Sequence, residues 1–466
     1  MDVVLLGVMA YMVIQFAIGV WVSRRNKSED DYLLAGRRLG VGLTAFTVFA
    51  TWFGAETVVG AAGNIYENGL SGGSGDPFGY AICLILLGLV FAVPLWRRRY
   101  TTFGDFFRQR YSSGVEKFFV LLVVPSSTLW AAAQIRAFGQ VVSTISDLDV
   151  TVAITAAAAF VIIYTVAGGL LATAVTDLVQ GLALMLGLGL LFFAVLNAAG
   201  GVEPALALVE PERLQLFGAL EKSFLEVVEA WAIPICGATL AAEVIARILA
   251  AHSAETARLA SVLGGTLYLA IGCIPVFIGL IGPGLLPGLE DAEQIIPQLA
   301  QQYLPTLFYV LFAGALISAI LSTVDSALLA AASLISHNVV VPLRGSMSER
   351  AKIRSARLCV VLLGILAYVL AIRANGVYEL IETAVAFGTA GVFVVGVLGL
   401  FTRIGGTPSA LAALIAGSVL WFVGEYFAGW TTPYLLSLAG AALAYLGVAA
   451  LEKIPIGKWQ ATRQET

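Results

Sequence analysis

Charge is scarce in this sequence. Only 12% of its 466 residues are Asp, Glu, Lys or Arg, whereas about 25% is usual for a soluble globular domain. Hydrophobic residues make up 59% of the chain, and the mean hydropathy is +0.92. This composition excludes an ordinary water-soluble protein. The net charge of −4 is mild and gives no indication of a nucleic-acid partner.

Residue types that bind metals or carry out catalysis are also few. The two histidines, His252 and His337, cannot build a His-rich metal centre. The four cysteines are scattered through apolar runs without a CxxC pair, which excludes a disulfide framework and a zinc site. No P-loop occurs, which argues against ATP-driven transport, and no HExxH motif occurs. We therefore do not expect an enzyme.

Long apolar runs dominate the chain, and about 20 such residues are needed to cross a bilayer as a helix. The first run lacks a basic leader and a small-residue cleavage site, so we expect a retained span and not a signal peptide. An all-α integral membrane protein with about 13 transmembrane helices is predicted. The runs are 3–22, 41–66, 76–96, 116–145, 149–171, 174–197, 222–249, 260–283, 304–338, 356–373, 378–401, 407–428 and 432–451.

Lys and Arg concentrate in alternate connections, chiefly 23–38, 97–110, 342–357 and the segment around Arg247 and Arg258. By the positive-inside rule these connections face the cytoplasm. The amino terminus is then outside and the carboxyl terminus cytoplasmic, which agrees with an odd number of spans in a plasma (cell inner) membrane. The outer connections 198–221 and 284–303 are short, so we expect neither an appended soluble domain nor an obligate protein partner.

Two of these runs contain helix-breaking residues in their middle. Gly54 and Gly60 interrupt the second run, and Pro234 and Gly237 interrupt the seventh. Such residues free backbone carbonyls, and broken spans in corresponding halves indicate an inverted-repeat secondary transporter. The predicted organisation is an extra span (3–22), a first repeat (41–197), a second repeat (222–401), two further spans (407–451) and a cytoplasmic tail (452–466).

The ninth run carries a polar stripe. Ala319, Ser322, Thr323 and Ser326 follow the i, i+3, i+4, i+7 spacing of one helix face, and Asp325 borders it. A carboxylate at this depth costs several kcal/mol unless it is paired, hydrated or bound to a cation. Hydroxyl and carboxylate oxygens are hard ligands that suit sodium. The alternative is that the hydroxyls bond to carbonyls one turn earlier or to neighbouring helices.

Acidic residues outnumber basic ones inside the expected spans. Glu56, Asp177, Glu243 and Asp325 face a single deep basic residue, Arg136. This excess of negative charge in a low-dielectric interior favours a bound cation. The alternative is that some of the acids are protonated or paired with arginine.

Three motifs resemble those of the sodium:solute symporter family: ATWFGAETVVGAAGNIYENGL (50–70), YTVAGGLLATAVTDLVQG (164–181) and SAILSTVDSALLAAASLISHNV (318–339). The resemblance covers nearly the whole chain. It implies a leucine-transporter-type 5+5 inverted repeat with one extra span before it and two after it. It also implies sodium-coupled import of a small polar organic solute by alternating access.

The same resemblance implies where the co-transported sodium ions bind. The usual site would use the backbone carbonyls of Ala50, Phe53 and Ala319 with the hydroxyls of Ser322 and Thr323. Some family members hold a second sodium, which here would involve Asp177, Ser322, Asp325 and Ser326.

Several segments look closest to the high-affinity choline transporters of the family, among them ATWFG, DPFGYAICLILLGL and LWAAAQIRAFG. This likeness would place Trp52, Tyr80, Trp130 and Asp325 around a quaternary ammonium, which aromatic faces attract. Two departures, Ala241 in place of a tryptophan and Glu56 in place of a small residue, imply a different cation or an ammonium-bearing zwitterion. The alternative for the aromatic residues is ordinary helix packing, and Asp325 could serve sodium instead.

Other functions remain open at this point. An amino acid, a monocarboxylate or a pantothenate-like solute would suit the same family. A sodium-conducting channel or a sensor would use similar residues, although a channel would pass current without a saturable dependence on solute. The expected partners are sodium, a small solute and the lipid bilayer.

Overall fold

The computed structural model describes residues 3–24, 26–146, 148–217, 223–374 and 377–452. These segments form helices joined by short connections, with no β-strand assigned among them. Ten of the described helices are long and apolar enough to cross a membrane, or eleven if one bent pair counts as a span. The all-α membrane fold is confirmed, while the count of thirteen stays a prediction. Residues 453–466 of the expected tail lie outside the described residues.

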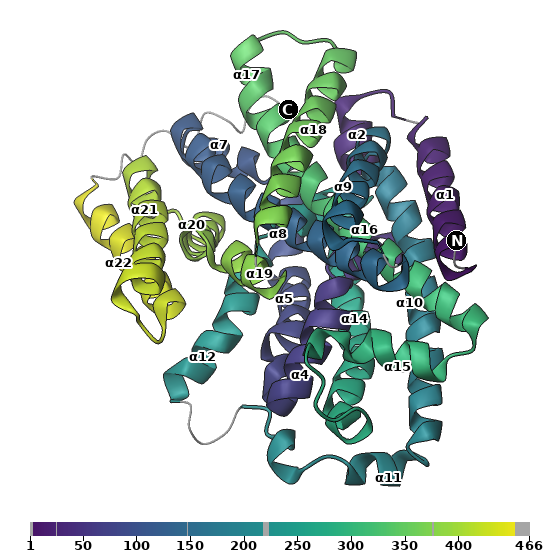
Figure 1. The fold of residues 1–466 in the computed structure, drawn as a ribbon. Coiled ribbons are helices and arrows are strands. Elements are labelled where there is room, and N and C mark those ends of the chain that lie inside the picture. Colours follow the sequence, from purple (N-terminus) through teal and green to yellow (C-terminus); the bar gives the residue numbers. More distant parts are fainter. Residues whose placement is uncertain (1–2, 25, 147, 218–222, 375–376, 453–466) are drawn as a thin grey trace.

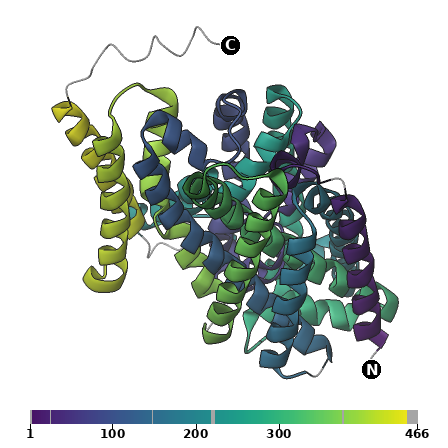
Figure 2. The same cartoon turned by 90° about the horizontal axis from the view of Figure 1, so that it is seen from above.

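The long helices α8 (Ser113–Ser146) and α16 (Thr306–Ile335) pack against each other in the middle of the molecule. Helix α1 (Val3–Ser23) lies at one side and the pair α21 (Thr407–Val423) and α22 (Pro433–Leu451) at the other (Figures 1 and 2). Every residue of α16 from 312 to 334 is buried. A helix buried on all sides needs partners for its polar groups, so the polar stripe of α16 meets protein and not lipid.

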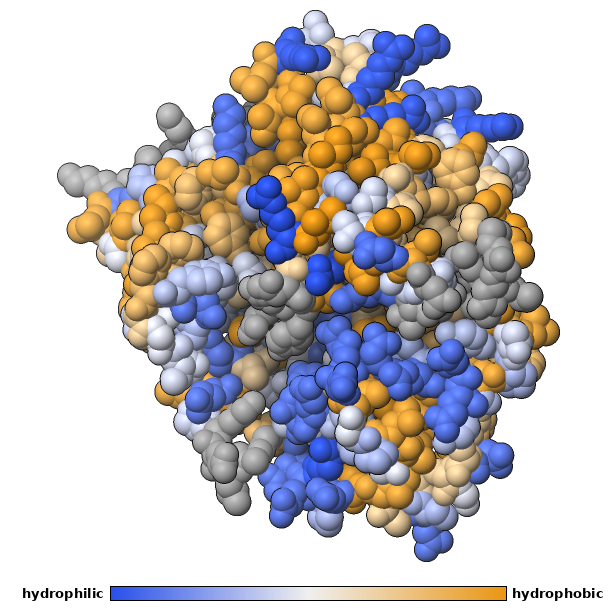
Figure 3. Space-filling view, viewed as in Figure 1, coloured by the Kyte–Doolittle hydropathy of each residue, from blue (hydrophilic) through white to orange (hydrophobic). Residues whose placement is uncertain are grey.

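Short helices that were not predicted cap the two ends of the molecule (Figure 1). One end carries α2 (Glu29–Leu34), α7 (Gly104–Arg110) and α17 (Val341–Arg344), and the other carries α11 (Val202–Ala207). A further short helix, α15 (Ile295–Tyr303), packs against α10 (Leu170–Ala198). Hydrophobic side chains cover the surface over α18 (Glu349–Arg373), α21 and α22, as expected of a face turned toward lipid (Figure 3).

Each predicted run contains helix, although some boundaries differ. The fifth and sixth runs separate at Gly168 and Gly169, a few residues earlier than predicted. Gly169 has a φ of +110°, and a Cβ there would lie 2.7 Å from the Tyr32 ring, so a glycine is required. The remaining α-helices are α3 (Val41–Ala50), α4 (Ala62–Asn68), α5 (Tyr80–Leu86), α6 (Ala92–Arg97), α9 (Val150–Ala167), α10 (Leu170–Ala198), α12 (Phe224–Ala232), α13 (Ala242–Ala250), α14 (Ala254–Leu285), α18 (Glu349–Arg373), α19 (Val377–Ala386) and α20 (Thr389–Phe401).

The two predicted breaks are present. In the second span α3 (Val41–Ala50) stops at Ala50, and the π-helical turn η2 (Glu56–Ala61) resumes the path. In the seventh span α12 continues through the π-helical turn η7 (Ile233–Gly237), and α13 follows at an angle of 43° after a break at 238–241. A third break, between α19 and α20, was not predicted; there Gly388 has a φ of +73°.

A network of charged groups joins α2, α7 and the π-helical turn η9 (Ser336–Val340), which follows α16, at one end of the molecule. His337 Nδ1 lies 3.0 Å from Glu29 Oε1, and His337 Nε2 lies 3.4 Å from Asp105 Oδ1. Burial alone would raise the pKa of Asp105, but bonds from His337 and from the amides of Thr101 and Thr102 lower it overall below its ordinary value of 3.8. The carboxylate form is therefore favoured by folding.

This network predicts acid lability. A group whose pKa is lower in the folded state contributes stability above its unfolded pKa and loses it as the pH falls through the folded value. We expect the melting temperature of the purified protein to drop below about pH 4, and Asp105→Asn to flatten that dependence. Asp30→Asn is the matched control, because Asp30 is half-exposed and lies 3.7 Å from Arg37. Equal acid dependence in the wild type and Asp105→Asn would contradict the assignment.

Candidate functional site

The break after α3 lies directly against α16. A Cβ on Gly54 would lie 3.0 Å from Thr323 Oγ1 and 3.3 Å from the Ala319 carbonyl oxygen. The two backbones approach this closely because Gly54 has no side chain. Phe53 immediately precedes it and is 1% exposed. The local sequence thus brings the turn at 51–54, where the regular helix is interrupted, to the polar stripe.

Ser322 connects the two elements. Its hydroxyl lies 3.4 Å from the Ala50 carbonyl oxygen and also donates to Asp177 Oδ1 on α10. Ser322, Thr323 and Ala50 are each at most 4% exposed. The structure therefore brings the predicted first sodium ligands to one buried place, where carbonyl and hydroxyl oxygens suit a hard monovalent cation.

The alternative reading of the hydroxyls holds for part of the stripe. Thr323 Oγ1 donates to the Ala319 carbonyl at 3.2 Å, and Ser326 Oγ donates to the Ser322 carbonyl at 2.7 Å. These are bonds to the preceding turn of the same helix. Ser322 differs, because its hydroxyl reaches across to two other elements.

Substituting Gly54 tests whether its close contact with Thr323 and Ala319 is needed for sodium binding. Gly54→Ala should push the break away from Thr323 and lower the apparent sodium affinity at least about tenfold, or 1.4 kcal/mol. Gly60→Ala is the matched control, because a Cβ at Gly60 meets nothing within 4 Å. The measurement is the rise in melting temperature with added sodium at constant ionic strength. A Gly54→Ala variant with wild-type sodium dependence would remove the break from the site.

Arg247 lies beside the predicted second sodium group and is only 1% exposed. Its Nη2 is 3.8 Å from Asp177 Oδ2 and donates to Ser326 Oγ, while its Nη1 donates to the Glu243 carbonyl at 2.9 Å. Sequence reasoning placed Arg247 in a cytoplasmic connection. The structure instead turns it inward, where it compensates buried carboxylate charge.

Asp325 belongs to this polar group and not to the aromatic residues. Thr173 donates to its Oδ2, and its Oδ1 has no hydrogen-bond partner among the described residues. Asp325 lines none of the cavities described below. Its position therefore favours the sodium side of the two alternatives.

The predicted aromatic residues do come together. The ring centroids of Trp52 and Tyr80 are 5.2 Å apart, and those of Tyr80 and Trp130 are 6.3 Å apart. Tyr80 donates from its hydroxyl to Glu56 Oε1 at 3.0 Å, and Trp52 Nε1 donates to Glu243 Oε1 at 3.1 Å. Two of the intramembrane acids thus contact this aromatic group.

Two cavities adjoin the aromatic group. The larger, of about 180 Å³, is lined by Glu56, Asp76 and Tyr80 among others. The smaller, of about 50 Å³, is lined by Trp52, Trp130, Ala241 and Glu243 among others. The absence of a large side chain at Ala241 accounts for part of this space. Each of the two cavities is therefore lined by part of the predicted solute site.

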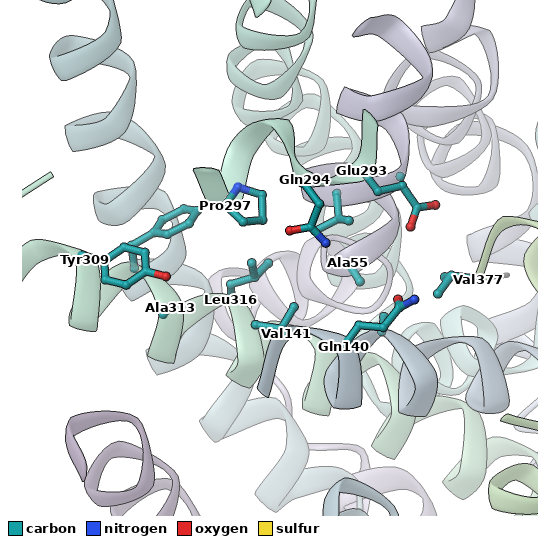
Figure 4. Close-up of a pocket in the computed structure, with 14 residues that line it drawn as sticks. Ala55, Gln140, Val141, Glu293, Gln294, Pro297, Tyr309, Ala313, Leu316 and Val377 are labelled. Atoms are coloured by element: carbon teal, nitrogen blue, oxygen red, sulfur yellow. The ribbon is translucent and has the colours of Figure 1, made fainter. Parts of the chain in front are cut away.

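An acidic approach adjoins the larger cavity and shares Gly60, Asn64 and Glu293 with its lining. A hollow of about 340 Å³ is lined by Glu67, Asp291 and Glu293. Burial, then the neighbouring Asp291 and Glu67, raise the pKa of Glu293, while Arg136 opposes them. Figure 4 shows Glu293 and Gln294 on one side of an adjacent pocket and Gln140 of α8 on the other. Several acids in one hollow attract cations.

Sequence reasoning missed Asp76, Glu293 and the role of Arg247. Asp76 precedes a proline at the start of the third run, and such a position is typical of an interfacial residue. Nothing local marks it as buried, yet it is 6% exposed. Thr47 and Thr173, which donate to Asp177 and Asp325, were also missed because single threonines are common in membrane helices.

The arrangement of the helices is the leucine-transporter fold. The chain aligns with a solved sodium-coupled sialic acid symporter in a substrate-bound, outward-open state at a TM-score of 0.85 and 18% identity, covering 97% of this chain and 98% of that one. A nucleobase-cation-symport-1 family transporter with bound bromovinylhydantoin aligns at a TM-score of 0.63 and 14% identity, covering 91% and 95%. At these identities the likeness establishes the fold.

The chain belongs to the sodium:solute symporter family, whose sequence profile matches residues 32–417. It is 28% identical over 413 residues to the Caenorhabditis elegans high-affinity choline transporter 1, covering 81% of this chain and 70% of that protein. The corresponding human protein is 26% identical, covering 90% and 76%. The Escherichia coli sodium/pantothenate symporter is 26% identical, covering 90% of each. The protein is therefore a multi-pass, sodium-coupled symporter of a small organic solute, and its family consists of transporters and not enzymes.

Proposed function

We propose that this symporter imports a small organic solute with a cationic group, driven by the inward sodium gradient. Sodium is held by the carbonyls of Ala50, Phe53 and Ala319 and the hydroxyls of Ser322 and Thr323. The observation that carries the proposal is Ser322, whose hydroxyl faces both the Ala50 carbonyl and Asp177. An ion there would tie the broken span to α16.

A second sodium ion is proposed at Asp177, Ser322, Asp325 and Ser326. Arg247 provides one positive charge there against the two carboxylates, which leaves one negative charge for a monovalent cation. This balance of charge supports a second ion. The bond from Arg247 to Ser326 Oγ counts against Ser326 as a ligand, because it already occupies that oxygen.

The solute site is proposed to lie between the aromatic group and the larger cavity, with Trp52, Glu56, Tyr80 and Trp130 as its residues and Ala241 leaving space beside them. Choline transport by several relatives and the acids along the approach both favour a solute with positive charge. Asp325 is assigned to sodium because it bonds to Thr173 and lines neither of the two cavities.

Transport would follow alternating access. Sodium binds from the outer end and joins α3 to α16, the solute binds beside the break near the midplane, and rocking of the two repeats opens the inner end. The amino terminus is placed outside and the carboxyl terminus in the cytoplasm of the plasma membrane. A charge moved down 100 mV contributes about 2.3 kcal/mol, which adds to the concentration gradient of sodium.

Proteoliposomes with an imposed inward sodium gradient test this function. Labelled choline, betaine, proline, pantothenate and monocarboxylates are screened for saturable uptake, with potassium replacing sodium as the control. We expect concentrative uptake of a cationic or zwitterionic solute. A sodium current that greatly exceeds solute flux and shows no saturation with solute would indicate a channel instead.

A further inference from the structure

The larger cavity contains two carboxylates that the sodium sites do not use. Glu56 comes from η2 and Asp76 from the π-helical turn η4 (Ser74–Gly79), and both line the cavity of about 180 Å³. Within the part of the chain that the structure describes, neither Glu56 Oε2 nor Asp76 Oδ1 has a hydrogen-bond partner, although both atoms are buried. Asp76 as a whole is 6% exposed.

The other oxygen of each carboxylate is held in place. The Tyr80 hydroxyl donates to Glu56 Oε1 at 3.0 Å. Thr57 Oγ1 and the Tyr268 hydroxyl donate to Asp76 Oδ2 at 2.7 Å and 3.0 Å. Each carboxylate is thus oriented through one oxygen and has the second oxygen left for a ligand.

Aromatic surface is limited in this cavity. Of the three aromatic residues predicted to surround the solute, Tyr80 lines the larger cavity, whereas Trp52 and Trp130 line the smaller one. A quaternary ammonium is held best by aromatic faces on several sides. Its methyl groups also cannot donate hydrogen bonds to Glu56 Oε2 and Asp76 Oδ1, the two carboxylate oxygens without a donor.

We propose, on the basis of the function proposed above, that the solute binds here through a cationic group with at least two N–H donors. A primary ammonium, an amidinium or a guanidinium fits: one N–H bonds to Glu56 Oε2 and another to Asp76 Oδ1. Charge-assisted bonds of this kind are strong, and a buried carboxylate oxygen left without a donor is penalised. A site built for N–H donors therefore rejects the permethylated analogue.

The size of the cavity distinguishes an organic ligand from a bare ion. About 180 Å³ is several times the roughly 30 Å³ that one water occupies in the liquid. The approach through Glu67, Asp291 and Glu293 concentrates cations of any kind and does not select those with N–H donors. Selection among cations is therefore assigned to Glu56 and Asp76.

The test compares matched pairs of amines and their fully N-methylated counterparts. Binding of ethanolamine and choline, glycine and glycine betaine, and putrescine and its hexamethyl analogue is measured on the purified full-length protein in sodium buffer by thermal shift and tryptophan fluorescence. We expect the N–H member of a binding pair to bind at least about tenfold more tightly, the size of a lost charge-assisted hydrogen bond. Glu56→Gln and Asp76→Asn should each reduce this preference to within about threefold. Glu67→Gln is the matched control, because it should weaken both members equally.

Equal or tighter binding of the methylated members would overturn the proposal, as would an absence of binding by all members. A preference unchanged in both Glu56→Gln and Asp76→Asn, or a loss of sodium binding in these variants with unchanged amine binding, would also overturn it. The comparison in the wild-type protein does not depend on the folding of any variant. Sodium-driven uptake of a quaternary ammonium would refute this inference and leave the proposed function standing, whereas no sodium-driven uptake of any solute would refute the proposed function.

Discussion

Replacing Ser322 by alanine is expected to lower the apparent sodium affinity by at least about tenfold, or 1.4 kcal/mol. The change removes a hydroxyl that faces the Ala50 carbonyl and donates to Asp177, so the ion loses a ligand and the carboxylate loses a donor. In the wild type, sodium at 100 times its dissociation constant should stabilise the folded protein by about 2.7 kcal/mol. At the same sodium concentration a site ten times weaker would keep about 1.4 kcal/mol, so at least about half of this stabilisation should disappear in Ser322→Ala.

Ser333→Ala is the control for that experiment. Ser333 lies on the same helix and is 9% exposed, but its hydroxyl donates only one turn back, to the Leu329 carbonyl at 2.5 Å. The readout is melting temperature against sodium concentration, with potassium keeping the ionic strength constant. Ser322→Ala and Ser333→Ala with the same sodium response would show that Ser322 is a structural hydroxyl and not a ligand.

Arg247→Met is expected to have the largest effect on stability. It would leave Asp177 and Asp325 without their cationic neighbour in a site that is almost completely buried. Removing one partner of a buried ion pair costs about 3–5 kcal/mol. We expect a large fall in melting temperature or a failure to accumulate folded protein. Arg247→Lys should be intermediate, because lysine keeps the charge but loses the planar fork that reaches both Ser326 and the Glu243 carbonyl.

A second substitution separates charge from packing at this position. Asp177→Asn combined with Arg247→Met removes both members of the pair and should recover part of the lost stability while sodium binding stays impaired. Arg258→Met is the control, because Arg258 is half-exposed and lies 4.0 Å from Glu255. An Arg247→Met protein as stable as the wild type would show that the buried carboxylates are neutral or compensated in another way.

Both predictions change a residue that contacts Asp177. Its Oδ1 accepts from Ser322, and its Oδ2 accepts from Thr47 and lies 3.8 Å from Arg247. Asp177 therefore joins α3, α10, α13 and α16, elements from both predicted repeats. A sodium ion that draws Ser322 toward Ala50 would change the bonds available to Asp177, and this offers a direct physical link between ion binding and the packing of the two repeats.

The sequence by itself determined the class of the protein. The features that indicate it are local: low charge, long apolar runs, glycines and a proline within two spans, and the hydroxyl stripe of 319–326. In the structure this stripe lies on the buried helix α16, beside a broken span. The gathering of Trp52, Tyr80 and Trp130 was reached only through the family resemblance, because no local pattern relates residues from three separate spans.

Only the tertiary structure decided where the long polar side chains point. Arg247 at the end of a span can extend to the interface or fold inward, and the choice depends on whether a carboxylate from another helix faces it; here Asp177 does. The same holds for Asp76, which is buried because Thr57 and Tyr268 meet it, and for Asp325, which bonds to Thr173 and lies apart from the cavities. Hydropathy fixes which segments enter the membrane, whereas the partner of a buried charge is set by packing between helices distant in the chain.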